Sequence, residues 1–168
     1  MAKPTNTLSL AQGDIEGVAA LGFTFDVAHE NIVIGAQFLK GSNDNSSETA
    51  CHWSACDTKS EFGQTTTNDY EVNTFGLYTG YEFPLNENFK LTPTIGYAWT
   101  SYEHDQVETR DYMYLKKVSR EERRIYESNG AAEVGLRLTL DNTIVIGTTH
   151  SFNDKVNKST MFTLGFQF

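Results

Sequence analysis

Residues 75–99 read FGLYTGYEFPLNENFKLTPTIGYAW, and this stretch decides the fold. In its first half, one set of alternate positions holds Phe75, Leu77, Thr79, Tyr81 and Phe83, and the other holds Gly76, Tyr78, Gly80 and Glu82. Successive side chains of a β-strand point to opposite faces, so a period of two indicates a strand with one apolar face. The second half repeats the pattern after Asn86-Glu87-Asn88, which predicts two antiparallel strands joined by a tight turn.

The same alternation recurs along the rest of the chain. It predicts strands within residues 19–27, 32–39, 74–85, 89–100, 132–140, 144–148 and 161–168. A weaker strand is expected at Asn6–Gln12, with Gly13-Asp14 as its turn. Proline cannot donate to a strand ladder, so we expect a local irregularity at Pro93. Closed barrels of the bacterial type have an even number of strands, so this pattern predicts about eight.

The two faces of these strands indicate which side is inside. The apolar face carries large aliphatic and aromatic groups, whereas the other carries glycines and the charged residues Glu82, Lys90, Glu133 and Arg137. Charged groups in a dry core would cost several kcal/mol each without good partners. A narrow polar lumen and an outer face in lipid avoid that cost. The sequence therefore predicts an all-β fold, an eight-stranded antiparallel up-and-down transmembrane β-barrel, with those four residues as a lumen charge network.

Segment lengths suggest the orientation. The turns near residues 28–30, 86–88 and 141–143 are short, whereas the segments at about 41–71 and 103–130 are long. Outer-membrane barrels have short periplasmic turns and longer external loops. We expect residues 1–168 to form a single barrel domain whose two long segments face the outside.

Composition excludes two other classes. Apolar runs such as residues 18–21 are far shorter than the roughly 20 residues that a membrane-spanning helix needs. A formal net charge of −9 argues against a nucleic-acid partner, which would require a clustered basic surface.

The end of the chain carries a family resemblance. The last strand, Phe162-Thr-Leu-Gly-Phe-Gln-Phe168, resembles the C-terminal strand by which outer-membrane barrels are recognised for assembly. The hairpins that begin at Gly22 and Gly76 are similar to those of small barrels of the OmpA, OmpX and Opa type. The resemblance implies a bacterial outer-membrane protein that contacts lipid, lipopolysaccharide and the barrel assembly machinery. It also implies an assembly signal at Phe162, Leu164, Phe166 and Phe168.

The expected function is a structural or binding role through the long external segments, with a host factor or another envelope protein as partner. The alternative is a narrow ion or small-solute channel, although eight-stranded barrels are barely wide enough for their own side chains. We expect no cofactor.

Two cysteines, Cys51 and Cys56, lie in the first long segment. An oxidising cell surface favours a disulfide between them that staples this segment. Metal binding by Cys51, His52 and Cys56 is the alternative, but no fourth ligand has a usual zinc spacing.

The second long segment mixes charges of both signs and is expected to be a solvated hairpin that extends the strands above the membrane. A binding surface is the alternative, because aromatic residues beside basic groups are common at interfaces. Its candidate residues are Arg110, Tyr112, Tyr114, Lys116, Lys117, Arg120, Arg123 and Arg124.

An enzymatic interpretation rests on His150-Ser151-Phe152-Asn153, which is similar to the His and Ser cluster of outer-membrane lipid A deacylases. In that family the two residues are two apart and share a face. Here His150 and Ser151 are adjacent and should point to opposite faces of a strand, so we expect no catalysis.

Overall fold

The computed structural model of the chain describes residues 4–15, 17–50, 61–112, 117–152 and 159–168. Nine strands are assigned: β1 (Thr5–Ile15), β2 (Val18–His29), β3 (Ile32–Ala50), β4 (Glu61–Tyr81), β5 (Phe83–Pro84), β6 (Phe89–Tyr112), β7 (Lys117–Leu140), β8 (Ile144–Phe152) and β9 (Ser159–Gln167). β5 is a short continuation of β4. The barrel wall therefore consists of eight strands, which we call staves, and β4 and β5 together form one of them. Among the described residues, no helix is long and apolar enough to cross a membrane.

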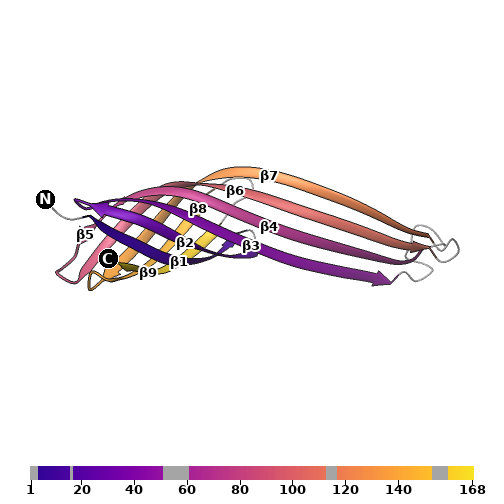
Figure 1. The fold of residues 1–168 in the computed structure, drawn as a ribbon, viewed down its shortest axis with the longest axis horizontal. Helices are drawn as coiled ribbons and strands as arrows, with labels where there is room; N and C mark the ends of the chain where they lie inside the picture. Colours follow the sequence, from indigo (N-terminus) through magenta and orange to yellow (C-terminus); the bar gives the residue numbers. More distant parts are fainter. Residues whose placement is uncertain (1–3, 16, 51–60, 113–116, 153–158) are drawn as a thin grey trace.

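Neighbouring strands around the barrel pair antiparallel, and β6 pairs with both β4 and its continuation β5. The pairing of β9 with β1 closes the cylinder. This closure includes the two ends of the chain, because the Phe168 amide donates to the Asn6 carbonyl and the Asn6 amide donates to the Phe168 carbonyl, each at 2.8 Å. Both termini therefore lie at the same end of the barrel (Figure 1). The predicted eight-stranded up-and-down barrel is confirmed, and so is the first strand.

The turns at the terminal end follow from residues that tolerate a left-handed backbone. Asn31 has φ 69° after Glu30 at φ 50°, and Asp141 and Asn142 have φ 50° and 51°. Asn and Asp adopt this conformation more readily than most residues, and it matches the twist of a tight hairpin.

The predicted turn at Gly13-Asp14 is wrong. Both residues continue β1 in register with β2, and the chain turns later, at Gly17 with φ 83°. The Gly17 amide donates a 3.0 Å hydrogen bond to Asp14 Oδ1. Asp14 therefore stabilises the turn from within the strand, while the glycine supplies the left-handed conformation.

Pro93 interrupts its ladder as predicted. β4 pairs with β6 as far as Gly80 opposite Thr94, and pairing resumes at Phe83 opposite Leu91. The interruption faces Pro93, which has no amide hydrogen to donate. This break separates β5 from β4 and leaves Glu82 at an irregular position whose side chain is buried.

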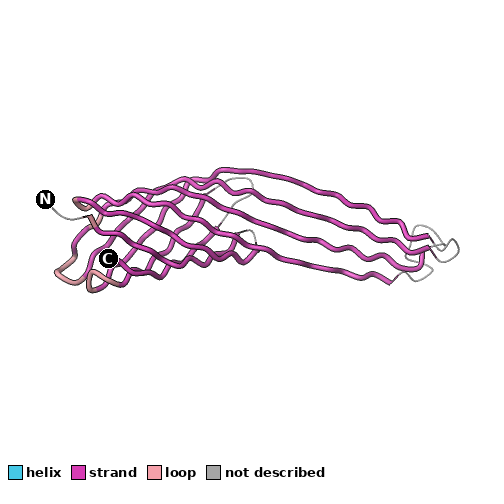
Figure 2. The backbone as a smooth tube through the Cα atoms, in the orientation of Figure 1, coloured by secondary structure: helices cyan, strands magenta, loops and turns pink. Residues whose placement is uncertain are grey.

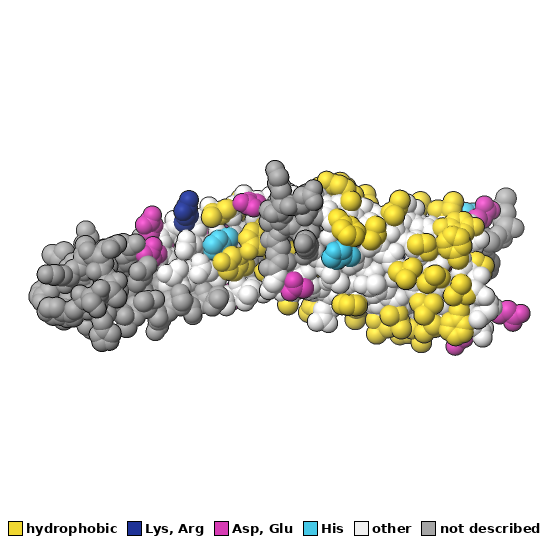
Figure 3. Space-filling view, turned by 180° about the vertical axis from the view of Figure 1, so that it is seen from behind, with side chains coloured by type: hydrophobic (Ala, Val, Ile, Leu, Met, Phe, Trp, Pro, Cys, Tyr) yellow, Lys and Arg dark blue, Asp and Glu magenta, His cyan; other side chains and the backbone are white. Residues whose placement is uncertain are grey.

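Side chains divide between the two faces as predicted. Lumen-facing residues such as Thr24, Gln37 and Thr92 are buried. Large apolar side chains cover the outside of every stave and form an apolar belt; examples in strand order, all 47–77% exposed, are Leu10, Phe23, Ile34, Leu77, Ile95, Leu136, Ile146 and Leu164. Figure 3 shows such side chains gathered over the barrel half of the molecule. This surface is suited to lipid and would be unusually apolar in water.

Four strands continue beyond the barrel. β2 pairs with β3 only as far as Gly41, and β8 pairs with β7 only from Ala132. Beyond those residues β3, β4, β6 and β7 run on together, as Figures 1 and 2 show. We call this the projecting sheet: residues 42–50, 61–71, 103–112 and 117–131. The expected hairpin in the second long segment is present, and the first segment is also a hairpin in its described part instead of an irregular loop.

Candidate functional site

The lumen holds a polar network at the level of the apolar belt. Arg137 Nη1 lies 2.7 Å from Asp26 Oδ2, and Tyr78 Oη donates a 2.9 Å hydrogen bond to the same oxygen. The Arg137 contact is an ion pair, and Nη1 makes no hydrogen bond within the described residues. Asp26 and Arg137 are almost fully buried, with side chains 2% and 11% exposed. The pair therefore neutralises two charges that neither lipid nor bulk water could solvate.

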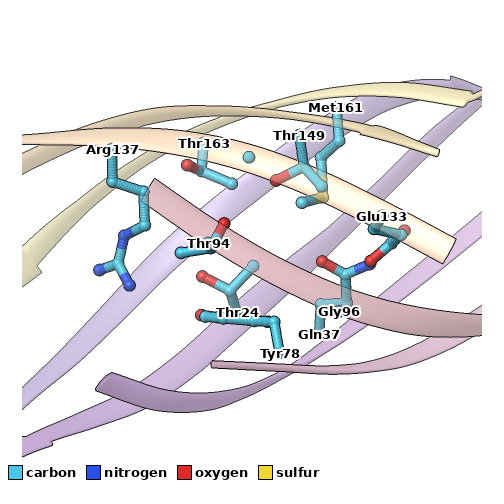
Figure 4. Close-up of a pocket in the computed structure, with 11 residues that line it drawn as sticks. Thr24, Gln37, Tyr78, Thr94, Gly96, Glu133, Arg137, Thr149, Met161 and Thr163 are labelled. Carbon is cyan, nitrogen blue, oxygen red and sulfur yellow. The ribbon is translucent and has the colours of Figure 1, made fainter. Parts of the chain in front are cut away.

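A second contact crosses the lumen from β3 to β7. Gln37 Nε2 donates to both Glu133 carboxylate oxygens, at 2.9 and 2.7 Å. Figure 4 shows these two side chains facing each other, with Tyr78 and Arg137 farther along the lumen. Gly35 leaves room for the Tyr78 side chain beside Asp26, because a Cβ at Gly35 would lie 2.4 Å from the Tyr78 ring.

A third group lies near the terminal end of the barrel. Lys90 Nζ donates to Glu82 Oε2 at 3.4 Å, and Gln167 Nε2 lies 3.4 Å from Glu82 Oε1. Gln167 Nε2 also donates to Thr5 Oγ1 at 3.0 Å. The first strand, the last strand and the β5 region are thus tied together by side chains at the point where the barrel closes.

The four charged residues expected in the lumen are all there, but they do not form one network. Glu82 and Lys90 meet each other, whereas Glu133 binds Gln37 and Arg137 binds Asp26. Asp26 is a charged partner that the sequence pattern did not single out. A signal for it exists, because Asp26 occupies the polar set of positions in its strand and is the only carboxylate there.

Apolar side chains pack together inside the barrel at the end from which the projecting sheet extends. A buried cluster lies there, with Tyr70 and Tyr102 packed against it; its members are Ala11, Ile15, Val18, Ala20, Leu39, Val72 and Met161. Below it, the lumen cavity lined by Glu133, Arg137 and Tyr78 has a volume of about 10 Å³. A water molecule needs roughly 10–15 Å³, so this cavity has room for about one water molecule at most.

His150 and Ser151 do not come together. His150 Nδ1 is 3.0 Å from Thr160 Oγ1, and its ring packs edge-on against the exposed Phe152. Ser151 is buried on the opposite face, with its Oγ 2.7 Å from Ser159 Oγ. This geometry keeps the Ser151 hydroxyl out of reach of the His150 ring.

Several predicted residues lie outside the described part of the chain. These are Cys51, His52 and Cys56, together with Tyr114 and Lys116. The disulfide therefore stays a prediction. Arg110, Tyr112, Lys117 and Arg120 belong to β6 or β7, and their strand positions place them in the projecting sheet.

Arg123 and Arg124 are exposed on the projecting sheet. Arg124 makes two hydrogen bonds to the Asp105 carboxylate, at 2.7 and 2.8 Å, and its Nε lies 3.3 Å from Glu103. The hydrogen bonds to Asp105 raise the pKa of Arg124. The positive charge of Arg124 is therefore already balanced by carboxylates of this chain.

The outward face of the projecting sheet is acidic. Asp44, Asp69 and Asp105 lie directly opposite one another on β3, β4 and β6. Beside them, Glu71 accepts a 2.7 Å hydrogen bond from Lys40, which lowers the pKa of the Glu71 carboxyl. A hollow of about 280 Å³ on this face is lined by these acidic residues together with Tyr70, Glu103 and Arg124. Among the residues that the structure describes, no group of His, Cys, Asp and Glu is arranged to hold a metal ion.

The inward face of the same sheet carries aromatic side chains above the mouth. The Tyr70 and His104 rings stack with centroids 4.3 Å apart, and the Tyr70 and Tyr102 ring centroids are 5.9 Å apart. His104 Nε2 is 3.2 Å from Asn68 Oδ1. These contacts join the projecting sheet to the apolar cluster and stiffen its base.

No protein-family model matches this chain, and no curated protein does. Solved structures do share its fold. A major outer membrane protein from Thermus thermophilus superposes with a TM-score of 0.55 at 11% identity, covering 99% of this chain and 100% of that one. The N-terminal β-barrel domain of Pseudomonas aeruginosa OprF gives 0.51 at 11% identity, with 98% and 97% covered.

The outer membrane protein Ail of Yersinia pestis, in a phospholipid bilayer nanodisc, gives a TM-score of 0.50 at 13% identity, covering 99% of this chain and 100% of that one. Sequence identities this low show that the folds are shared and do not show that the functions are. The apolar belt of this chain adds an independent indication that the cylinder lies in lipid. The chain thus has the fold of the small eight-stranded bacterial outer-membrane barrels, and its outer surface is apolar, as a lipid-facing surface is.

Proposed function

We propose that this chain is a surface-binding protein of the outer membrane, in which the barrel is the anchor and the projecting sheet contacts a partner protein. The observation that carries the proposal is the extension of β3, β4, β6 and β7 beyond the apolar belt. A membrane anchor alone does not need those residues. Their polar and charged side chains would lie in water, where a partner could reach them.

The open border of β3 favours a protein partner. Within the described residues, positions 42–50 of β3 pair only with β4. This border therefore presents backbone donors and acceptors to which an extended segment of another protein could add a strand. Lipopolysaccharide phosphates fit less well, because Lys40 and Arg124 are already paired with carboxylates.

Trimming the projecting sheet tests this proposal. Residues 43–70 and 104–125 would each be replaced by an Asn-Gly turn, which leaves the barrel and its belt intact. Bacteria displaying the full chain should adhere to an epithelial cell monolayer, and bacteria displaying the trimmed chain should lose most of that adherence. A gel-mobility shift on boiling checks that the trimmed barrel folds. Equal adherence of both strains would refute the proposal.

The closed lumen argues against a transport role on physical grounds, and it gives a further prediction. The chain reconstituted in a planar lipid bilayer should show no steady single-channel current, because the cavity of about 10 Å³ and the apolar cluster block the path. Steady steps of uniform size from the folded barrel would contradict the closed lumen and revive the channel alternative.

We also propose that the last strand carries the assembly signal expected from its sequence. Phe162, Leu164, Phe166 and Phe168 all point outward and are 58–70% exposed. They form one apolar row along β9, beside the point where β9 closes on β1. This row is available to the barrel assembly machinery before the barrel closes, and to lipid afterwards.

A further inference from the structure

The border of β3 in the projecting sheet presents one set of alternate residues. The Asn31 carbonyl, immediately before β3, accepts a 2.7 Å hydrogen bond from the Glu82 amide on the β4 side, so odd-numbered residues of β3 point their backbone groups toward β4. Backbone groups alternate along a strand, and the register with β4 runs unbroken to Ala50, so even-numbered residues point theirs the other way. In the barrel those groups meet β2, but within the described residues this pairing ends at Gly41. From residue 42 to residue 50 they face the border, which Figure 1 shows along one side of the projecting sheet.

A row of charged side chains crosses the sheet and ends at this border. Its members lie directly opposite one another on β3, β4, β6 and β7, and they are Asp44, Asp69, Asp105 and Arg124. Like charges directly across an antiparallel pair are destabilising, and opposite charges are stabilising. Arg124 balances Asp105 from the β7 side, with hydrogen bonds of 2.7 and 2.8 Å. Within the described residues neither Asp44 nor Asp69 has a charged partner, so the β3 end of the row lacks a counter-charge.

We propose that the β3 border binds an extended segment of a partner protein as an added antiparallel strand, with a lysine or arginine of that segment opposite Asp44. The inference rests on the proposed binding function and names the chemistry of the partner. Asp44 points its backbone groups toward the added strand, so the basic residue would exchange two backbone hydrogen bonds with it. The side chains of these two residues would then lie on the same outward face and form an ion pair.

The space beside Asp44 has room for a long basic side chain. The hollow of about 280 Å³ begins at Ser42 and Asp44 on β3 and continues across the acidic row to Arg124. Asp44 and Asp69 are exposed, so a partner could reach both carboxylates. Five carboxylates line the hollow, and within the described residues two cations balance them, Arg124 and the nearby Lys40. The remaining negative charge favours a cation and repels an anion.

The same charge disfavours pairing of this border with its equivalent on a second copy of the chain. The even-numbered positions from 42 to 50 carry Ser, Asp, Ser, Glu and Ala, with no basic residue among them. In every register such a pairing would set acidic residues against each other or against uncharged ones. The border has no proline, and its register with β4 has no bulge, so strand addition is not blocked in general. Charge is therefore the feature that selects a basic segment.

Methylation of the backbone of a probe peptide separates strand addition from simple charge attraction. The probe is a fluorescent peptide of alternating threonine and lysine, the lysine peptide. The full chain is held in phosphatidylcholine nanodiscs, whose neutral lipid does not attract the probe. Fluorescence anisotropy should show binding of the lysine peptide and none of a matched peptide of threonine and glutamate. Methylating the lysine amides should abolish binding, because they would donate to β3, whereas methylating the threonine amides should not, because they would point away.

Two exposed carboxylates of the projecting sheet provide matched variants. Asp44→Lys should weaken binding of the lysine peptide about tenfold, because it sets like charges across the added pair. Glu127→Lys makes the same change of charge on β7, away from this border, and should weaken binding much less. The gel shift on boiling checks that both variants are folded.

Three results would overturn the proposal: a lysine peptide that does not bind, equal losses in the two variants, or undiminished binding after methylation of the lysine amides. If one of these appears while trimming the projecting sheet still removes adherence to the epithelial monolayer, the binding function stands with a partner of different chemistry.

Discussion

Replacing Asp26 with alanine should lower the free energy of unfolding by about 3–5 kcal/mol, because it leaves the Arg137 guanidinium buried without its counter-charge. Arg137 is 11% exposed, and its contact with Asp26 is 2.7 Å. The change also removes the acceptor of the Tyr78 hydroxyl. The measurement is urea unfolding of the chain in lipid vesicles, followed by the change in circular dichroism.

Two further variants distinguish loss of charge balance from general damage to the barrel. Glu87→Ala removes an exposed carboxylate from a turn and should change stability little. The double variant Asp26→Asn with Arg137→Met removes both charges and keeps an acceptor for Tyr78, so it should recover most of the loss. If Asp26→Ala is as stable as the wild type, the ion pair does not support the lumen as described.

An arginine on the lipid side should have a comparable effect. Ile95 lies on β6, midway along the apolar belt, and it is 65% exposed. Ile95→Arg should cost about 2–4 kcal/mol in a bilayer, because a charged side chain on the lipid face near the midplane must leave water. The same vesicle unfolding experiment measures the loss.

Val107 provides a matched control for Ile95. It lies on the same strand and the same outward face, but within the projecting sheet. Val107→Arg should therefore change stability little, and it places the new charge opposite Glu122. Equal losses at both positions would show that Ile95 does not face lipid.

Much of the barrel could be predicted because each stave carries its own signal. The alternation of Phe75, Leu77 and Phe83 with glycines and Glu82 sets a strand, its two faces and its lipid side at once. The polar face could not be placed in a soluble core without unpaired charges. The turn after the first strand is harder to place, because Gly13-Asp14 has turn-like composition, whereas tertiary pairing carries both residues along β1.

The contacts inside the lumen could not be predicted in the same way. Gln37 and Glu133 are 96 positions apart and lie on strands that are not neighbours. Their meeting depends on the stagger of the whole closed sheet, which no local pattern encodes. The projecting sheet is also only partly predictable, because polar residues such as Asp69 and Asp105 show no apolar alternation to distinguish a solvated strand from a loop.

The most direct test of the membrane barrel is the electrophoretic mobility of the lipid-refolded chain in dodecyl sulfate, with and without boiling. A closed barrel whose apolar belt is embedded in detergent should stay folded at room temperature and migrate at a different position from the boiled chain. Identical mobility before and after boiling, from a chain that also remains soluble in plain buffer, would contradict a lipid-facing belt and a polar lumen.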